Sequence, residues 1–157
     1  MRIWLLTSVL VASVAACATM RRDPLPLSVR LASADTLVRW VVDSALVADF
    51  DCDGLADSAF VGRAPERISV GIVRGSAPTP TIISFGVHGS RIQEHAGSAD
   101  AILTLESIDY DPKEDIGELE GFRQSSTCKG LNLGDGDSDA MHLYWNHKTG
   151  ALDWWRR

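Results

Sequence analysis

The chain has 157 residues, of which 45% are hydrophobic, a length sufficient for one domain with a real core but short for two. Its 21 acidic side chains outnumber 15 basic ones and give a formal net charge of −6. This balance argues against nucleic-acid binding, which depends on a basic patch or stripe, so we expect no nucleic-acid partner.

The N-terminus has the pattern of an export signal. Arg2 supplies a positive charge, and residues 3–16 form an apolar run without charge. The run is shorter than the ~20 residues that a membrane-spanning helix needs. We therefore expect residues 1–16 to be a signal peptide and the protein to be exported.

The apolar run ends in Val14-Ala15-Ala16-Cys17, which resembles the lipobox of bacterial lipoproteins. In that family the cysteine is diacylated and becomes the first mature residue, so the resemblance implies that Cys17 anchors the protein to a membrane. Val14 stands where leucine is commoner, and ordinary cleavage near Cys17 is the alternative. Ala18 stands where aspartate typically retains such lipoproteins at the inner membrane, which favours the periplasmic face of the outer membrane. Without lipidation the protein would be periplasmic or secreted.

Residues 17–27 carry two prolines and a pair of arginines, a composition typical of an extended tether. We interpret residues 28–157 as a single mainly-β domain. Its beginning is ambiguous, because apolar residues before position 40 fit one short helix capped near Ser33 or Asp35, whereas the Val-rich segment 40–42 suits a strand.

The later sequence shows the apolar alternation of β-strands. Expected strands lie at residues 45–48, 58–62, 68–72, 83–87, 101–105, 141–145 and 152–154. Gly150 suits the left-handed position of a hairpin turn between the last two. Because alternation buries one face of each strand and leaves the other wet, we expect an antiparallel sheet or sandwich of about seven strands.

Two cysteines follow the leader, Cys52 and Cys128. An exported chain lies in an oxidising compartment, so a disulfide between them is the expected state. On the chain-entropy view, closing so long a loop stabilises the fold by about 4 kcal/mol. A catalytic thiol is the weaker interpretation, because neither cysteine has a histidine close in sequence.

The plainest chemistry lies in the segment Asp49-Phe50-Asp51-Cys52-Asp53-Gly54-Leu55-Ala56-Asp57. Its carboxylates would repel one another in a tight loop, and a hard divalent cation with oxygen ligands relieves that repulsion. Gly54 permits the sharp bend that turns ligands inward, and Leu55 can offer its backbone carbonyl. We therefore predict a structural calcium site with the ligands Asp49, Asp51, Asp53, Leu55 and Asp57. A solvated turn is the alternative, because Asp and Gly are ordinary turn residues.

An EF-hand is excluded, because it requires flanking helices and a glutamate where this loop has Phe60. Residues 49–62 instead resemble the aspartate loop and the following apolar strand of FG-GAP and VCBS-type repeats, and Ala64-Pro65 is similar to their Gly-Ala-Pro ending. In that family the loop binds calcium between two strands of a propeller blade, and the repeats mediate adhesion or ligand binding. The resemblance covers about residues 45–75 in one copy, which cannot form a propeller, and the family's upstream Phe-Gly is missing.

Two other groups of potential ligands are weaker. The acidic cluster at residues 135–139 repeats the alternation but lacks the glycine and the last acid of the first loop, so we interpret it as a polar loop. The four histidines lack the i, i+4 spacing of a zinc motif, and we expect His142 to be exposed.

Aromatic residues gather in the C-terminal hairpin. Alternation predicts that Trp145 and Trp154 point inward, while Tyr144 and Trp155 point outward beside Arg156. An outward aromatic pair next to an arginine is a candidate recognition patch, since such residues dominate binding hot spots.

Two functions fit this sequence. The favoured one is a non-catalytic cell-envelope protein with a structural calcium loop, a binding or adhesion-type module whose partner is an envelope protein or glycan. The alternative is a small envelope hydrolase that uses carboxylates of the acidic segment 109–120. No Gly-x-Ser-x-Gly elbow supports serine hydrolysis.

Overall fold

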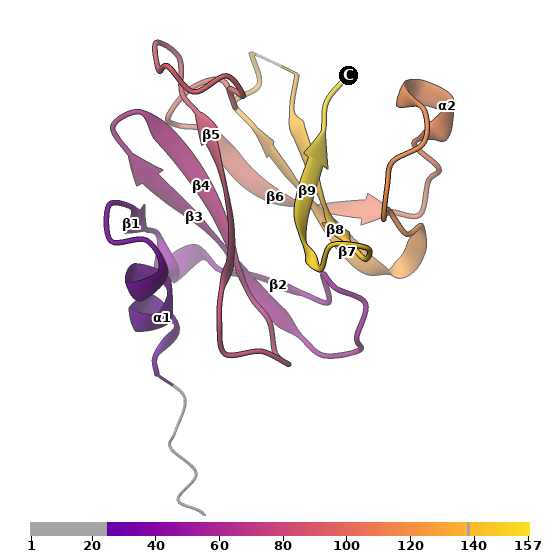
Figure 1. Cartoon of the computed structure of the whole chain (residues 1–157), viewed down its shortest axis with the longest axis horizontal. Coiled ribbons are helices and arrows are strands. Elements are labelled where there is room, and N and C mark those ends of the chain that lie inside the picture. The colour runs from indigo at the N-terminus through magenta and orange to yellow at the C-terminus, as the bar shows by residue number, and fades with distance from the viewer. Residues whose placement is uncertain (1–24, 138) are drawn as a thin grey trace, which may run out of the picture.

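The computed structural model describes residues 25–137 and 139–157, which form two facing antiparallel sheets (Figure 1). The first sheet contains β1 (Arg39–Trp40), β2 (Leu46–Ala48), β3 (Asp57–Ala64), β4 (Arg67–Val73) and β5 (Thr81–Gly86). The second contains β6 (Ile102–Ile108), β7 (Ser125–Gly134), β8 (Met141–Asn146) and β9 (Ala151–Trp155). Helical segments are α1 (Leu27–Ala34), η1 (Val42–Ser44) and α2 (Lys113–Ile116). The prediction of a mainly-β antiparallel fold is confirmed, with nine strands among the described residues.

The main core lies between the two sheets. Ile68, Val70 and Ile72 of β4 share one face of their strand, as the two-residue period requires, and all three are buried. They belong to one apolar cluster with Leu131 and Leu143 of the second sheet. Burial of such side chains, at about 25 cal/mol per Å², is the main favourable term that holds the sheets together.

A smaller core covers the outer face of the first sheet. There Leu31 of α1 packs with Phe60 and Val73, and the Trp40 ring lies against them. A side chain at Gly62 would collide with this indole, since a Cβ there would lie 2.8 Å from a ring carbon of Trp40. Strands β3 and β4 are therefore covered on both faces.

The N-terminal helix lies earlier in the chain than predicted. It spans Leu27–Ala34. It therefore starts at the last residue of the expected tether, and Asp35, which we expected near its start, caps its C-terminal end. Pro26 stands at its start and lacks the N–H that a helix start leaves unpaired. Arg39–Trp40 enter the first sheet as β1, which pairs with β3, whereas Val42 begins η1.

The sequence pattern does not predict β7, although it is the longest strand. Its first half, residues 125–130, is polar and glycine-containing, and only Leu131 and Leu133 show the alternation of a buried strand. Pairing with β6 imposes the extended conformation on this first half, whereas β8 pairs only with residues 131–133. A bulge between Ser107 and Ile108 of β6 accommodates the irregular first half.

The outward prediction for Tyr144 and Trp155 is wrong, because their exposed fractions are 4% and 6%. The segment before β7 folds over this face of the second sheet. Phe122 contacts the Tyr144 ring edge-on at 5.4 Å, and Tyr110 contacts the Trp155 ring at 6.3 Å. Arg156 is exposed but donates a hydrogen bond to a backbone carbonyl, so these residues do not form an open recognition patch.

His142 is half-buried rather than exposed, for the same reason. Its ring stacks on the Trp155 indole at 4.0 Å, and its Nδ1 lies 2.8 Å from Oε1 of Glu106. The same carboxylate oxygen accepts a hydrogen bond from the Tyr110 hydroxyl. Burial raises the pKa of Tyr110, and the Glu106 charge adds to this shift.

The terminal hairpin agrees with its prediction. Residues 147–150 connect β8 to β9, and Gly150 has the left-handed φ of +68°. Buried Asn146 closes the turn, because its Oδ1 accepts hydrogen bonds from the N–H groups of Lys148 and Thr149.

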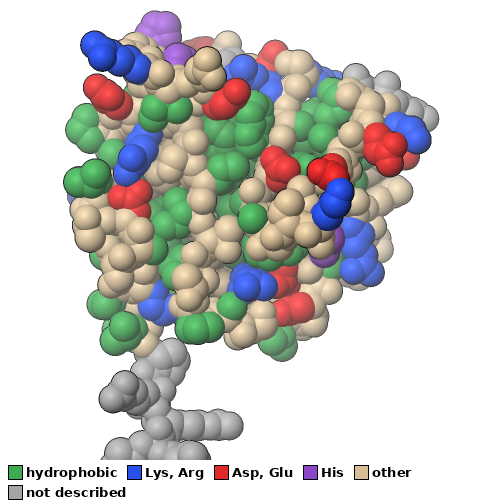
Figure 2. Space-filling model, viewed as in Figure 1, with side chains coloured by type: hydrophobic (Ala, Val, Ile, Leu, Met, Phe, Trp, Pro, Cys, Tyr) green, Lys and Arg blue, Asp and Glu red, His purple; other side chains and the backbone are tan. Residues whose placement is uncertain are grey.

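The predicted signal peptide (1–16), the anchor Cys17 and most of the tether lie outside the described residues. Within the described part, none of the helices combines the length and apolar character required to cross a membrane. On the face shown in Figure 2, basic side chains are scattered among acidic and apolar ones.

Candidate metal centre

The aspartate loop joins two paired strands, as the sequence predicts. The last pair of the β2–β3 ladder is Ala48 with Asp57, and residues 49–56 form the connection. Asp57 is thus the first residue of β3, and its backbone is held by the sheet. The loop is therefore fixed at both ends by one antiparallel pair.

Three of the four predicted carboxylates converge. Single oxygens of Asp49, Asp51 and Asp57 all lie within 4.8 Å of one another. Two oxygens bound to one calcium ion at 2.3–2.6 Å can be up to about 5 Å apart, so these three can share an ion. Asp51 and Asp57 are buried, whereas Asp49 is partly exposed and leaves a side open to solvent.

Asp53 is not part of this group and has another role. Its Oδ1 accepts a hydrogen bond from the N–H of Leu55 at 2.8 Å, which closes a tight turn. A hydrogen bond with the Ser76 side chain is the main cause that lowers the pKa of Asp53. Leu55 itself is exposed.

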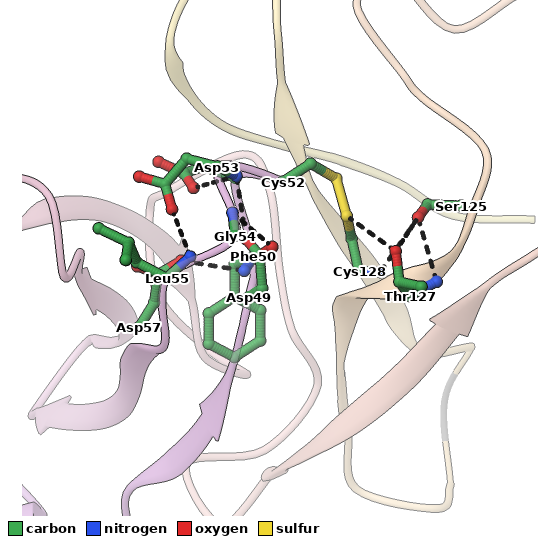
Figure 3. Close-up of a disulfide and its surroundings, with 11 residues drawn as sticks. Asp49, Phe50, Cys52, Asp53, Gly54, Leu55, Asp57, Ser125, Thr127 and Cys128 are labelled. Carbon is green, nitrogen blue, oxygen red and sulfur yellow. Dashed lines mark hydrogen bonds between the residues drawn. A yellow bond between two sulfur atoms is a disulfide. The ribbon is translucent and has the colours of Figure 1, made fainter.

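Backbone N–H groups hold the converging carboxylates in place (Figure 3). The two oxygens of Asp49 accept hydrogen bonds from the N–H groups of Asp53 at 3.2 Å and Gly54 at 3.0 Å. Asp51 also accepts one from Asp53. The turn needs left-handed backbone at Gly54 (φ +87°) and at Cys52 (φ +59°), the latter uncommon for a residue with a side chain.

Asp57 is the most deeply placed of the three, with an exposed fraction of 0%. Its oxygens accept hydrogen bonds from the N–H groups of Gly75 at 2.8 Å and Phe50 at 2.9 Å. Burial raises the pKa of this carboxyl, although these two hydrogen bonds act in the opposite direction. Because its pKa lies above the value in an unfolded chain, ionised Asp57 lowers the stability of the fold at neutral pH. A bound cation would offset that cost.

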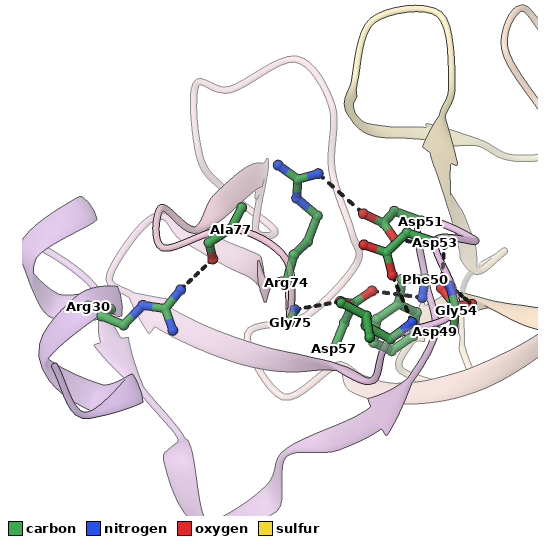
Figure 4. Close-up of polar contacts among 11 residues, drawn as sticks. Arg30, Asp49, Phe50, Asp51, Asp53, Gly54, Asp57, Arg74, Gly75 and Ala77 are labelled. Carbon is green, nitrogen blue, oxygen red and sulfur yellow. Dashed lines mark hydrogen bonds and ion pairs between the residues drawn. The ribbon is translucent and has the colours of Figure 1, made fainter. Parts of the chain in front are cut away.

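Arg74 forms an ion pair with the group (Figure 4). Its Nη1 lies 3.2 Å from Oδ2 of Asp51, and its guanidinium lies over the Trp145 ring at 4.9 Å. One guanidinium against three carboxylates leaves two negative charges unbalanced. At this spacing each carboxylate pair repels by on the order of 3 kcal/mol at an effective dielectric constant of about 20.

Arg30 supports the centre from a distance. It extends from α1 and donates hydrogen bonds to the carbonyl oxygens of Ala77 and Pro78, both at 2.7 Å. These residues belong to the β4–β5 connection that also contains Gly75, whose N–H reaches Asp57. The helix therefore helps to position one wall of the centre.

His147 lies within electrostatic reach of Asp51 and Asp49. Burial lowers the pKa of His147, and Arg123 lowers it further, whereas the charges of Asp51 and Asp49 oppose the shift. The lowered pKa of His147 favours the neutral imidazole over the charged form.

The predicted disulfide is confirmed (Figure 3). Cys52 in the loop is bonded to Cys128 in β7, with their Cα atoms 5.5 Å apart, within the usual range. The neighbouring N–H of Lys129 donates to the carbonyl of Asp49 at 3.0 Å. These two links attach a loop of the first sheet to the second sheet.

The other acidic segments do not form a comparable centre within the described part of the chain. Asp135 accepts hydrogen bonds from the N–H groups of Ser98 and Asp137, so it fixes a polar loop that leads into β8, as predicted. In the segment proposed for hydrolysis, Asp111 accepts from the N–H of Lys113 and Glu120 pairs with Lys148.

Sequence reasoning misses Arg74, Gly75 and Arg30, since no pattern in the aspartate segment indicates which distant residues face it. The only available signal is the Arg74-Gly75-Ser76 turn directly after a predicted strand. No family model, no curated protein and no solved structure matches this chain.

We expect Asp57→Ala to destabilise the metal-free protein by about 2–4 kcal/mol, because it removes the acceptor of the buried Phe50 N–H and of the partly buried Gly75 N–H. Asp43→Ala, at an exposed position of η1, should change stability by less than about 0.5 kcal/mol. Urea unfolding of both variants in chelator gives the comparison. Equal stability of the two variants would show that Asp57 does not organise the loop.

Proposed function

We propose that the chain is a non-catalytic, exported cell-envelope protein in which a calcium ion fastens the aspartate loop. The observation that carries this proposal is the convergence of Asp49, Asp51 and Asp57, which form an ion pair with one arginine among the described residues. Calcium suits the group better than magnesium, since it accepts six to eight oxygens in irregular geometry whereas magnesium demands a near-ideal octahedron. Water and the Leu55 carbonyl complete the ligands in this proposal.

The ion has a structural role in this proposal. It stabilises the ionised form of buried Asp57 and removes the repulsion among the three carboxylates. The loop is bonded through Cys52 to β7, so ordering the loop also orders the contact between the two sheets. A rigid β domain held at the envelope suits the binding of an envelope protein or a glycan. None of the described side-chain contacts favours the hydrolase alternative.

Calcium at 10 mM should stabilise the protein by about 1.4–2.7 kcal/mol, given a dissociation constant on the order of 10⁻⁴ to 10⁻³ M for a single extracellular loop. The melting temperature should then rise by roughly 3–10 °C over that in chelator. Asp49→Asn should reduce the rise, because it removes a charged ligand at the open side.

Asp43→Asn is the matched control and should keep the full calcium response. Isothermal titration calorimetry on the same samples measures the affinity directly. A flat titration up to 10 mM calcium, or an unchanged response in Asp49→Asn, would contradict the calcium centre.

Lipid anchoring through Cys17 is the second part of the proposal, supported by the lipobox-like sequence. Cys17→Ser should move the protein from the membrane fraction to the soluble periplasmic or secreted fraction, as measured by fractionation and immunoblotting. Retention of the variant in membranes would argue against the anchor and would leave the calcium centre untouched.

A further inference from the structure

A hollow of about 350 Å³ opens between the two sheets at the end opposite to the aspartate loop along β3. Its lining residues are Val41, Ser44, Leu46, Val61, Arg63, Ile102 and Leu103. Val41, Leu46 and Leu103 pack against the main core but are only partly buried, so the hollow leads from the surface to the core. Its volume lies within the range of about 300–1,000 Å³ typical of small-molecule sites.

A charged side chain stands in this apolar hollow. Arg63 lies on the same face of β3 as Ala59 and Val61, which belong to the core between the sheets. Its Nη2 donates a hydrogen bond to the carbonyl of Ala101 at 3.0 Å. Its Nη1 is buried and has no hydrogen-bond partner within the described part of the chain. A guanidinium nitrogen without an acceptor is unfavourable, and a turn of the Arg63 side chain toward the hollow would bring this nitrogen to a ligand oxygen.

A second arginine adds to the unbalanced charge. Arg39 of β1 is paired directly with Arg63 in the β1–β3 register. Like charges directly opposite in an antiparallel pair destabilise it. Among the described side chains, which exclude those of residues 114 and 115, no carboxylate lies within 4.0 Å of either guanidinium. An anion at this position would relieve the repulsion between them.

The mouth of the hollow is apolar. Ile102, at the start of the edge strand β6, has an exposed fraction of 65%. An alkyl chain that enters between Ile102 and Leu46 would cover such surface, while a carboxylate would accept from Arg63, whose fork geometry suits bidentate pairing. We propose that this hollow binds an amphiphilic anion with a single alkyl chain and a carboxylate head.

The test is a calorimetric titration of the Cys17→Ser protein with dodecanoate below its micelle concentration. Cys17→Ser removes any acyl chain on the protein that could compete. The buffer contains chelator, since calcium precipitates alkyl carboxylates. We expect saturable binding of about one dodecanoate per chain, with much weaker binding of dodecanol, which lacks the charge, and of acetate, which lacks the chain.

Arg63→Gln should weaken dodecanoate binding by at least about tenfold, because a hydrogen-bonded charge pair is lost. Arg91→Gln, at an exposed arginine that does not line the hollow, should leave the affinity unchanged. If Arg63→Gln fails to fold, Ile102→Glu replaces it: its charge at the mouth should repel the carboxylate and weaken binding relative to Ile102→Gln.

Absence of saturable dodecanoate binding would overturn the proposal. So would equal affinity for dodecanol, or equal affinity of Ile102→Glu and Ile102→Gln. Because the assay contains no calcium, its failure leaves the calcium centre intact, and failure of the calcium centre leaves this site intact.

Discussion

The repulsion among three carboxylates that the backbone holds together is the constraint on which this structure depends. Asp49, Asp51 and Asp57 cannot move apart, since N–H groups of the loop and of Gly75 bind their oxygens. Within the described part of the chain, only Arg74 opposes their combined charge through an ion pair, at Asp51. Such a group could hold a metal ion. We propose calcium, because it accepts an all-oxygen set of ligands in irregular geometry.

The loop also joins the two halves of the fold. Its ends belong to β2 and β3 of the first sheet, whereas Cys52 is bonded to β7 of the second. Arg30 brings α1 into the same arrangement through the β4–β5 connection. A change at the centre would therefore affect contacts on three sides, and this arrangement supports the structural role that we propose for the ion.

Much of the fold can be predicted from the sequence where burial produces a clear period. The alternation in β4 and β8 and the turn at Gly150 gave correct strands and a correct hairpin. Pattern fails where tertiary pairing overrides it, as in the polar half of β7. Alternation also misplaces Tyr144 and Trp155, because it names the face of a sheet but not whether another segment covers that face.

The candidate centre can likewise be predicted only in part from the sequence. Spacing in the aspartate segment identifies the carboxylates that converge, and the segment contains the cysteine that forms the disulfide. It does not separate Asp53, whose side chain closes a turn, from the three that form the group. Nor can it reveal Arg74 or the unpaired Arg63, since both depend on contacts between strands far apart in the sequence.

Diffraction from crystals grown in calcium chloride, recorded at a wavelength where calcium scatters anomalously, tests the centre most directly. The calcium proposal requires one anomalous peak at about 2.3–2.6 Å from carboxylate oxygens of Asp49, Asp51 and Asp57. A map without a peak at these residues, with the three carboxylates still held only by N–H groups and Arg74, would contradict it.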